Sequence, residues 1–315
     1  MDGFEQKATA NTVGARLQFE NYRKLFQGVS GSLGTTFQIN ENISLKANIG
    51  RAYRSPNLTE IGSNGLDPGA HIIYLGNRNF KSEFSLQEDL GVHFSYENIT
   101  AEASFFNNNI QNYIYMEAVA DAQGNPLLDA QGNRTNTYKQ AAAQLFGTEM
   151  FVTVHPKKWK GFQWKNTLAT VYGFNKAKIY RGKGTQGEFL PLIPPLMATS
   201  ELLYSIRLKK LAKWTFTPKA GMEFNTEQNR FLGLNGTETF TPQYTLFSLG
   251  ATIAFEYLDN KSILFVFEVN NLLNKAYQSH LNRLKYFEYY QQSPDGHFGI
   301  YNMGRNLTFK VVVPF

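Results

Sequence analysis

Five histidines are the first residues in this sequence that could bind a metal ion or haem, because the chain has no cysteine to supply thiolate ligands. A neutral imidazole is a common ligand for transition metals. His71 has no second histidine within a few residues, so a metal site built around it needs a distant partner such as His280 or His297. The simpler interpretation of each histidine is a solvated side chain in a loop or, for His93 and His155, on the polar face of a strand.

Two groups of cationic and tyrosine residues could instead bind an anionic, partly aromatic ligand. Cationic side chains attract anions, and tyrosine rings add apolar contact. The groups are Arg51, Tyr53 and Arg54 near the start, and Arg283, Lys285, Tyr286 and the rest of the "YFEYY" run at 286 to 290 near the end. Aromatic residues at loop tips can equally contact lipid headgroups or pack on one another, so both interpretations stay open.

Hydrolytic chemistry has little support in the residue pattern. A hydrolase needs a nucleophile or a water molecule activated by a nearby base. Only Ser95 stands at same-face spacing beside a histidine of an alternating segment, His93. We therefore do not expect an enzyme.

The elements that must position these residues are predicted by a period of two in hydrophobicity. In residues 214–225 the even-numbered positions are apolar and the odd-numbered positions are mostly polar, which indicates a strand with one face against an apolar medium. Similar segments are 13–22, 28–39, 43–53, 86–96, 99–108, 146–155, 162–175, 201–210, 246–257, 262–270 and 306–315. The pattern thus predicts about twelve strands of about ten residues each. A strand of this length can cross a bilayer at a tilt.

The expected connections alternate in length. Short polar turns at 40–42, 97–98, 156–161, 208–213 and 258–261 take turns with long loops, the longest near 55–84 and 276–297. This alternation is typical of an up-and-down antiparallel barrel in an outer membrane, with short periplasmic turns and long external loops. The strands of a soluble β-sandwich would also alternate apolar and polar residues. They would not be expected to carry charged, polar and glycine residues along whole faces. We therefore predict an all-β protein, a portion of a transmembrane β-barrel.

Composition is consistent with this class and excludes others. No apolar run of about 18 residues could span a bilayer as a helix, whereas aromatic residues make up 15% of the chain. The formal charge is +6, but the Lys and Arg residues are scattered, so we do not expect nucleic acid as a partner. The first residues lack a basic region and an apolar region, so no export signal is expected there.

Four motifs, in order along the chain, resemble TonB-dependent outer-membrane receptors. "ANIGRAYRSPNLTEI" at 47 to 61 is similar to the strand that leads into the family's Arg-Ala-Pro box, with Ser55 at the alanine. "YLGNRNFKSE" at 74 to 83 is similar to its Gly-Asn-Pro-Asn-Leu-Lys-Pro-Glu box, with Arg78 and Ser82 at the prolines. "FEVNNLLNKAY" at 267 to 277 and "GIYNMGRNLTFKVVVPF" at the end resemble the last two strands, with Met303 at a proline.

The resemblance implies that residues 1–315 are the C-terminal portion of the receptor barrel, without the N-terminal plug, a signal peptide and about ten of about 22 strands. It implies TonB-energised uptake of a scarce nutrient, first of all a ferric siderophore. Haem, zinc or copper uptake is the alternative, because His71 lies between the two boxes, where haem-uptake members carry a ligating histidine. A passive channel is the alternative in another class.

The resemblance also implies where ligands and partners would act. Ligand-binding candidates are Arg51, Tyr53, Arg54, His71, His280, Arg283 and Tyr286. Phe309 and Phe315 would form the signal that the outer-membrane barrel assembly machinery reads. The other implied partners are outer-membrane lipid and lipopolysaccharide, TonB through the missing plug, and the ferric chelate. No resident cofactor is expected, and the identity of any metal stays open.

Overall fold

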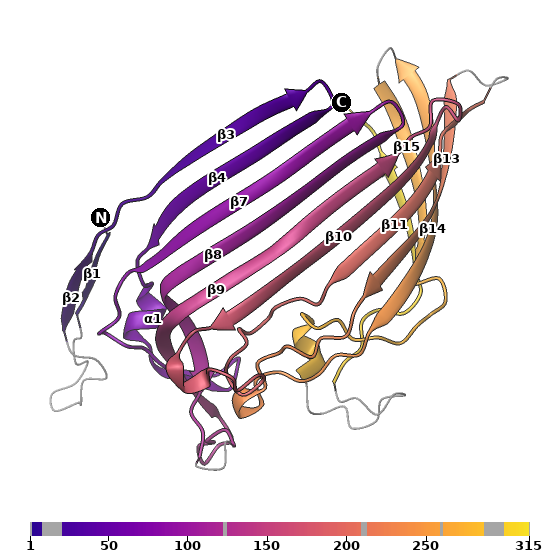
Figure 1. Ribbon diagram of the computed structural model, residues 1–315. Helices are drawn as coiled ribbons and strands as arrows, with labels where there is room; N and C mark the ends of the chain where they lie inside the picture. Colours follow the sequence, from indigo (N-terminus) through magenta and orange to yellow (C-terminus); the bar gives the residue numbers. More distant parts are fainter. Residues whose placement is uncertain are drawn as a thin grey trace.

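The computed structural model describes residues 2–7, 21–121, 125–208, 213–258, 261–286 and 299–314. A single large antiparallel sheet dominates it (Figure 1). The continuous path of the sheet contains β3 (Gly31–Asn40), β4 (Ile43–Arg54), β7 (Glu83–Tyr96), β8 (Ile99–Ala118), β9 (Arg134–Val154), β10 (Phe162–Asn175), β11 (Met197–Tyr204), β13 (Trp214–Asn225), β14 (Tyr244–Leu258), β15 (Lys261–Asn270) and β16 (Asn306–Val312). Neighbours in space are neighbours along the chain, so the predicted up-and-down meander and the all-β class are confirmed.

Smaller elements lie off this path. The strands are β5 (Asn64–Asp67), β6 (Ile72–Leu75) and β12 (Ile206–Arg207), and a separate hairpin contains β1 (Asp2–Gln6) and β2 (Tyr22–Phe26). Short helices are α1 (Leu58–Gly62), η1 (Lys178–Tyr180), η2 (Leu234–Gly236) and η3 (Arg283–Tyr286). β6 pairs with β9 in parallel, which the sequence analysis did not expect. No helix in the described part of the chain is both long and apolar enough to cross a bilayer.

Strand lengths depart from expectation in one region. β8 and β9 contain 20 and 21 residues, about twice the predicted length, and they carry the sheet well into the predicted loop region. The expected strand 13–22 falls mostly on residues outside the described part of the chain. The other eleven expected strands are all present in the sheet, some with shifted ends.

The strand register assigns each residue to one of two faces. Leu45 of β4 lies between Phe37 of β3 and Val92 of β7, so these three side chains share the apolar face. The next residue of β4, Lys46, belongs to the polar face. At the other edge of the sheet, Phe309 of β16 lies on the apolar face, with its ring 4.7 Å from that of Phe267.

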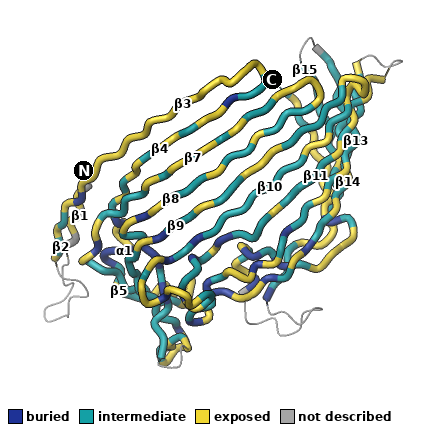
Figure 2. The backbone as a smooth tube through the Cα atoms, in the orientation of Figure 1, coloured by how far each residue is buried: buried dark blue, intermediate teal, exposed yellow. Residues whose placement is uncertain are grey.

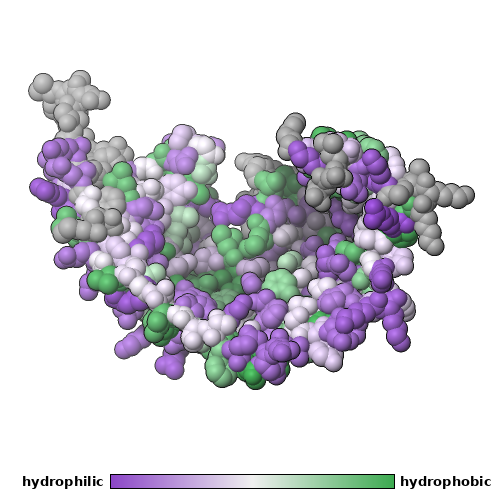
Figure 3. Space-filling view, turned by 90° about the horizontal axis from the view of Figure 1, so that it is seen from above, coloured by the Kyte–Doolittle hydropathy of each residue, from purple (hydrophilic) through white to green (hydrophobic). Residues whose placement is uncertain are grey.

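Glycines within the strands indicate which face is concave. Seven of them belong to the polar face: Gly34, Gly50, Gly91, Gly147, Gly173, Gly221 and Gly250. A Cβ atom on Gly147 would lie 2.2 Å from the carbonyl oxygen of Thr170. Side chains converge on the concave side of a curved sheet, where glycine relieves the crowding. The polar face therefore lines the inside of the open trough that Figure 3 shows.

Among the described residues, little of the chain covers the apolar face of the sheet. Leu33 near one edge and Leu307 at the other are 76% and 77% exposed. Burial of such a side chain is worth about 1.5–3 kcal/mol, so a whole sheet face of them needs an apolar medium. No second sheet packs on this face among the described residues, which argues against the soluble sandwich and for contact with lipid.

Buried residues concentrate at the loop end of the sheet, opposite the short turns (Figure 2). The small hydrophobic core there contains Ile110 of β8, Ala143 of β9, and Leu190 and Ile193 of the β10–β11 connection. Ile110 and Ala143 belong to the polar, concave face. The β10–β11 loop thus folds over the inner wall, and the loop end of the trough is where the chain builds fixed three-dimensional sites.

Candidate functional site

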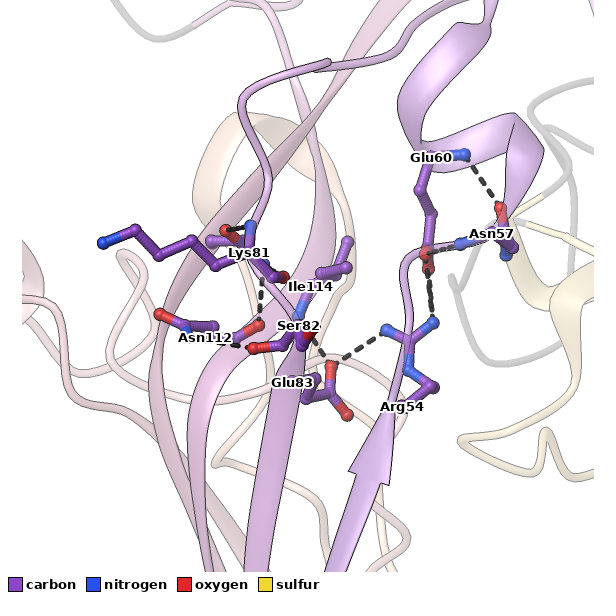
Figure 4. A network of polar contacts seen from close by, with 9 residues as sticks. Arg54, Asn57, Glu60, Lys81, Ser82, Glu83, Asn112 and Ile114 are labelled. Carbon is purple, nitrogen blue, oxygen red and sulfur yellow. Dashed lines mark hydrogen bonds and ion pairs between the residues drawn. The ribbon is translucent and has the colours of Figure 1, made fainter. Parts of the chain in front are cut away.

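Arg54, the last residue of β4, holds two carboxylates at the loop end of the trough (Figure 4). Its Nη1 atom lies 3.0 Å from each carboxylate oxygen of Glu60, and its Nη2 atom lies 2.9 Å from Oε2 of Glu83. The Glu60 residue is 8% exposed. Because a buried carboxylate needs a paired cation, Arg54 is committed to the protein itself.

Glu60 also fixes the first turn of α1. The Glu60 backbone N–H donates to Oδ1 of Asn57, and the Asn57 N–H donates to Oε2 of Glu60, both at 2.8 Å. This reciprocal arrangement is a capping box. One carboxylate therefore caps α1 and pairs with the end of β4, which fixes the path of the chain as it leaves the sheet.

The second motif docks on the first. The Asn77 N–H donates to the carbonyl oxygen of Glu60 at 2.8 Å. A Cβ atom on Gly76 would lie 2.6 Å from the carbonyl group of Ile61, so only glycine fits there. Glu83 accepts from the N–H of Ile114 in β8 at 3.1 Å. The structure therefore joins the motifs at 47 to 61 and 74 to 83 into one junction between β4, α1, β7 and β8, hereafter the β4 junction.

Arg51 and Tyr53 lie on the other face of β4, so the predicted grouping with Arg54 at the lumen is not what the structure shows. Register places both on the apolar face with Phe84 of β7. The guanidinium carbon of Arg51 is 4.3 Å from the Phe84 ring centroid, and the Tyr53 ring centroid is 5.6 Å from it. The physical reason is the pleat of the strand: odd and even positions point to opposite sides.

His71 lies at the tip of the β5–β6 hairpin and is exposed. Its backbone has a φ of 54°, and its Nδ1 atom is 3.2 Å from Oδ1 of Asn133, just before β9. His297 lies outside the described residues. Within the described ranges, no cluster of three or more histidine and acidic residues is arranged to hold a metal ion.

His280, by contrast, is buried, with 1% of its surface exposed. Its Nδ1 atom is 2.8 Å from Oγ1 of Thr241, and its Nε2 atom is 3.8 Å from Oε2 of Glu238. Lys285 is 4% exposed and donates to the carbonyl oxygens of Thr239 and Phe240 at 2.9 and 2.7 Å. These contacts tie the β15–β16 connection to the β13–β14 connection, in what we call the β14 junction. They leave the imidazole of His280 without access to a ligand at the surface.

Charges in the β14 junction interact across the loops. Burial lowers the pKa of Lys285 to about 8, although Glu238 opposes this shift. Burial alone raises the pKa of the Glu238 carboxyl, but His280 and the N–H groups of Leu232 and Leu192 outweigh it and lower the pKa overall. The N–H groups donate to the two Glu238 oxygens at 2.9 and 2.6 Å. Glu238 therefore stays ionised and holds a third segment, the β10–β11 loop, in the same junction.

The remaining predicted residues have separate positions. Arg283 is exposed in η3, and the structure does not describe the side chain of Tyr286. Phe309 lies on the apolar face in the middle of β16, and Phe315 lies outside the described residues. The assembly signal thus stays a prediction.

Farther from the loops, the concave face is polar and carries charges of both signs. Lys46 lies 3.7 Å from Glu102, and the Asn48 amide donates to Asp89 at 3.1 Å. These residues line an open cavity of about 400 Å³. The wall of the trough is therefore suited to a polar occupant, such as protein or hydrated solute, rather than to lipid.

Sequence reasoning missed the acidic partners. Glu60 carried a usable signal, because Asn57 followed three residues later by Glu60 fits the capping-box pattern. No local sequence pattern identifies Glu238 and Thr241, because their partner His280 comes from a connection about 40 residues away in the sequence.

Comparison with known proteins agrees with this architecture. The family model described as "TonB dependent receptor-like, beta-barrel" matches residues 1–272. A probable TonB-dependent siderophore receptor, PirA of Acinetobacter baumannii, is 26% identical over 169 residues, which are 50% of this chain and 20% of that protein. The ferric enterobactin receptor of Pseudomonas aeruginosa is 29% identical over 107 residues, which are 31% of this chain and 14% of that protein.

Solved structures share the fold. The copper transporter OprC superposes with a TM-score of 0.67 at 21% identity, over 90% of this chain and 39% of that one. A variant of the ferric enterobactin receptor of Pseudomonas aeruginosa has a TM-score of 0.59 at 19% identity, over 94% of this chain and 40% of that one. The chain thus spans less than half the length of each of these four proteins. With a family model matching most of its length and a sheet of the same architecture, the chain belongs to the TonB-dependent receptor family of outer-membrane β-barrels.

Proposed function

We propose that the whole protein is an outer-membrane receptor that binds a ferric siderophore at its external loops and imports it in a step energised by TonB through a plug domain. The observation that carries this proposal is the similarity to two siderophore receptors, one of them for ferric enterobactin. The chain contributes a polar concave wall and a loop end held by two buried polar junctions.

Ligand contacts are best assigned to the exposed residues of the loop end. Arg283 and His71 are exposed in the loops, whereas Arg54 and His280 are engaged in the two junctions. Arg51 and Tyr53 belong to the lipid-facing side of β4. We therefore assign Arg283 the role of attracting the anionic chelate and His71 that of a polar contact at the loop surface.

An uptake assay tests this proposal. Cells that lack the gene and carry the full-length protein on a plasmid should accumulate iron from an anionic ferric catecholate. The Arg283→Gln variant should take up several-fold less at limiting ligand, while Arg51→Gln, which removes the same charge from the lipid-facing side, should match the wild type. Equal uptake by cells with and without the gene, for every siderophore supplied, would contradict the proposal.

The alternative ligand class is a metal ion or haem, because the exposed imidazole of His71 could ligate either. Growth of the deletion strain with haem, zinc or copper as the limiting nutrient distinguishes the two classes. Loss of growth on one of these, with unchanged growth on all ferric siderophores, would favour the alternative.

A further inference from the structure

A notch interrupts the apolar face of the sheet at its loop end. β10 continues to Asn175, but the register of its neighbour β11 begins only where Met197 lies opposite Ala169. β13 ends at Asn225, also opposite Met197. Beyond Ala169 the next partner of β10 on that side is a short bridge between Phe174 and Phe189 of the β10–β11 loop. A cavity of about 250 Å³ lies between this bridge and the start of β11.

The lining of this cavity is aromatic on one side and cationic on the other. Tyr172 and Phe174 of β10 line it, and both lie on the apolar face with Phe146 of β9. The Phe146 ring centroid lies 5.4 Å from that of Tyr172 and 5.9 Å from that of Phe174. Arg230 enters from the β13–β14 connection, with its guanidinium carbon 4.6 Å from the Tyr172 ring centroid. The cation therefore lies at the loop end of the lipid-facing side.

Buried contacts hold Arg230 in this position. The Arg230 N–H donates to Oε1 of Gln228 at 3.0 Å, and Nε2 of Gln228 donates to the carbonyl oxygen of Ile193 at 2.7 Å. Gln228 is 5% exposed. The segment that carries Arg230 is thus attached to the β10–β11 loop, which limits the conformational entropy that a bound ligand would cost at this point.

The notch has more cationic than anionic side chains. Lys176 follows β10 with its ammonium nitrogen 5.3 Å from the Phe174 ring centroid. No carboxylate in the described ranges lies within 4.0 Å of the charged groups of Arg230 or Lys176. Glu227 lines the same cavity, but its Oε1 accepts a hydrogen bond from Asn229. Two unpaired cations beside an apolar aromatic surface match an amphiphile with an anionic head.

We propose that this notch binds an anionic lipid of the surrounding leaflet, with a phosphate group between Arg230 and Lys176 and an acyl chain along Tyr172, Phe174 and Phe146. Arg230 can donate two parallel hydrogen bonds to phosphate oxygens, and the Tyr172 ring beneath it adds a cation–π contact. The acyl chain continues over the apolar face toward the middle of the membrane. This site differs from the proposed siderophore site, because the aromatic rings that would hold the acyl chain belong to the apolar face of the sheet and not to the trough.

Lipid occupancy of the purified full-length protein tests the proposal. The protein is exchanged into phosphatidylcholine nanodiscs that contain a few mole per cent of lipid A, and the lipid A that co-purifies is counted by native mass spectrometry. The double variant Arg230→Gln/Lys176→Gln should retain about tenfold less lipid A than the wild type, as expected for the loss of two charged contacts. The matched control Lys165→Gln, exposed on the concave face, should retain the wild-type amount.

Two further arms identify the source of the phosphate. Lipid A without phosphate groups should not be retained, and inorganic phosphate at millimolar concentration should not displace intact lipid A. Equal retention by the wild type and the double variant would overturn the site. Full displacement by inorganic phosphate would overturn the lipid assignment. Circular dichroism and heat-modified gel mobility confirm that each variant is folded, and no siderophore is present, so failure here leaves the proposed function untouched.

Discussion

The two buried polar junctions at the loop end of the trough both hold connecting segments together, but they use different chemical groups. The β4 junction joins segments close in sequence, since Arg54 is 6 residues from Glu60 and 29 from Glu83. The β14 junction joins connections about 40 residues apart and contains an imidazole and a buried ammonium group, both below 5% exposure. The β4 junction is built on a guanidinium, which is not deprotonated in proteins, whereas the β14 junction contains Lys285, whose pKa burial lowers to about 8. The comparison predicts that the β14 junction responds to pH above about 8, through Lys285, and that Arg54 of the β4 junction does not.

The largest effect is expected from Arg54→Met. This change leaves Glu60 and Glu83 without their cation, and we expect a loss of about 2–3 kcal/mol in the free energy of unfolding, less than for a fully buried pair because Arg54 is partly exposed. Denaturant unfolding of the detergent-solubilised full-length protein measures it. Arg51→Met, on the same strand but the other face, should cost less than about 0.5 kcal/mol. Equal losses for the two variants would contradict the assignment of Arg54 to the junction.

In the β14 junction the sharpest variant is Thr241→Val. Thr241 has no exposed surface, and its hydroxyl contacts both the imidazole of His280 and the ammonium group of Lys285. Valine keeps the shape but leaves both partners short of a hydrogen bond, so about 2 kcal/mol should be lost. The Thr239→Val variant is the control, since Lys285 donates to the backbone oxygen of Thr239, which this change keeps. A cost as large for Thr239→Val would show that the hydroxyl of Thr241 is not the relevant group.

The pH dependence of stability separates the two junctions. Burial lowers the pKa of Lys285 from 10.5 to about 8 in the folded protein. Between pH 8 and 10.5 the unfolded chain therefore binds more protons than the folded one, and the free energy of unfolding should rise with pH across this window, by about 1–2 kcal/mol after discounting for solvent screening. Below pH 8 Lys285 is protonated in both the folded and the unfolded protein, so it adds no further change of stability with pH. Lys285→Met should abolish the rise, while Arg54→Met should retain it; the same rise in Lys285→Met would assign it to another group.

The smallest effect is expected from Asn57→Ala, which removes the side-chain cap of α1 but leaves the Arg54 ion pairs in place. A lost cap costs about 1 kcal/mol. The variant Asn57→Ser, which retains a capping oxygen, should recover most of the loss. If Asn57→Ala costs as much as Arg54→Met in the same unfolding assay, the cap and not the ion pairs holds the β4 junction together.

The sequence predicted the sheet well wherever the period of two was unbroken. Residues 214–225 were predicted as a strand, and β13 has the same bounds. β8 was predicted to end near residue 108 because the pattern breaks shortly after. The structure shows why: the register shifts between Ile110 and Tyr113, with Asn112 at a φ of 57°. A bulge inserts a residue and reverses the faces, so alternation cannot be followed across it.

The candidate site was less predictable than the sheet. Alternation alone already separates Arg51 and Tyr53 from Arg54, but residue type suggested a single group. Burial of His280 could not be predicted, because it depends on Thr241 and Glu238 from another connection. Local patterns fix strands and caps, whereas contacts between loops depend on the closure of long connections, for which one sequence holds no signal.

The central claim is that one face of this sheet meets lipid and the other lines a polar trough, and cysteine scanning of β13 tests it most directly. The chain has no native cysteine, so single cysteines at positions 216, 217, 222 and 223 of the full-length protein can each carry a fluorophore. Labels at Phe216 and Met222 should be quenched by brominated lipid, and labels at Thr217 and Glu223 by aqueous iodide. Quenching that does not alternate, or lipid quenching at positions 217 and 223, would contradict the account.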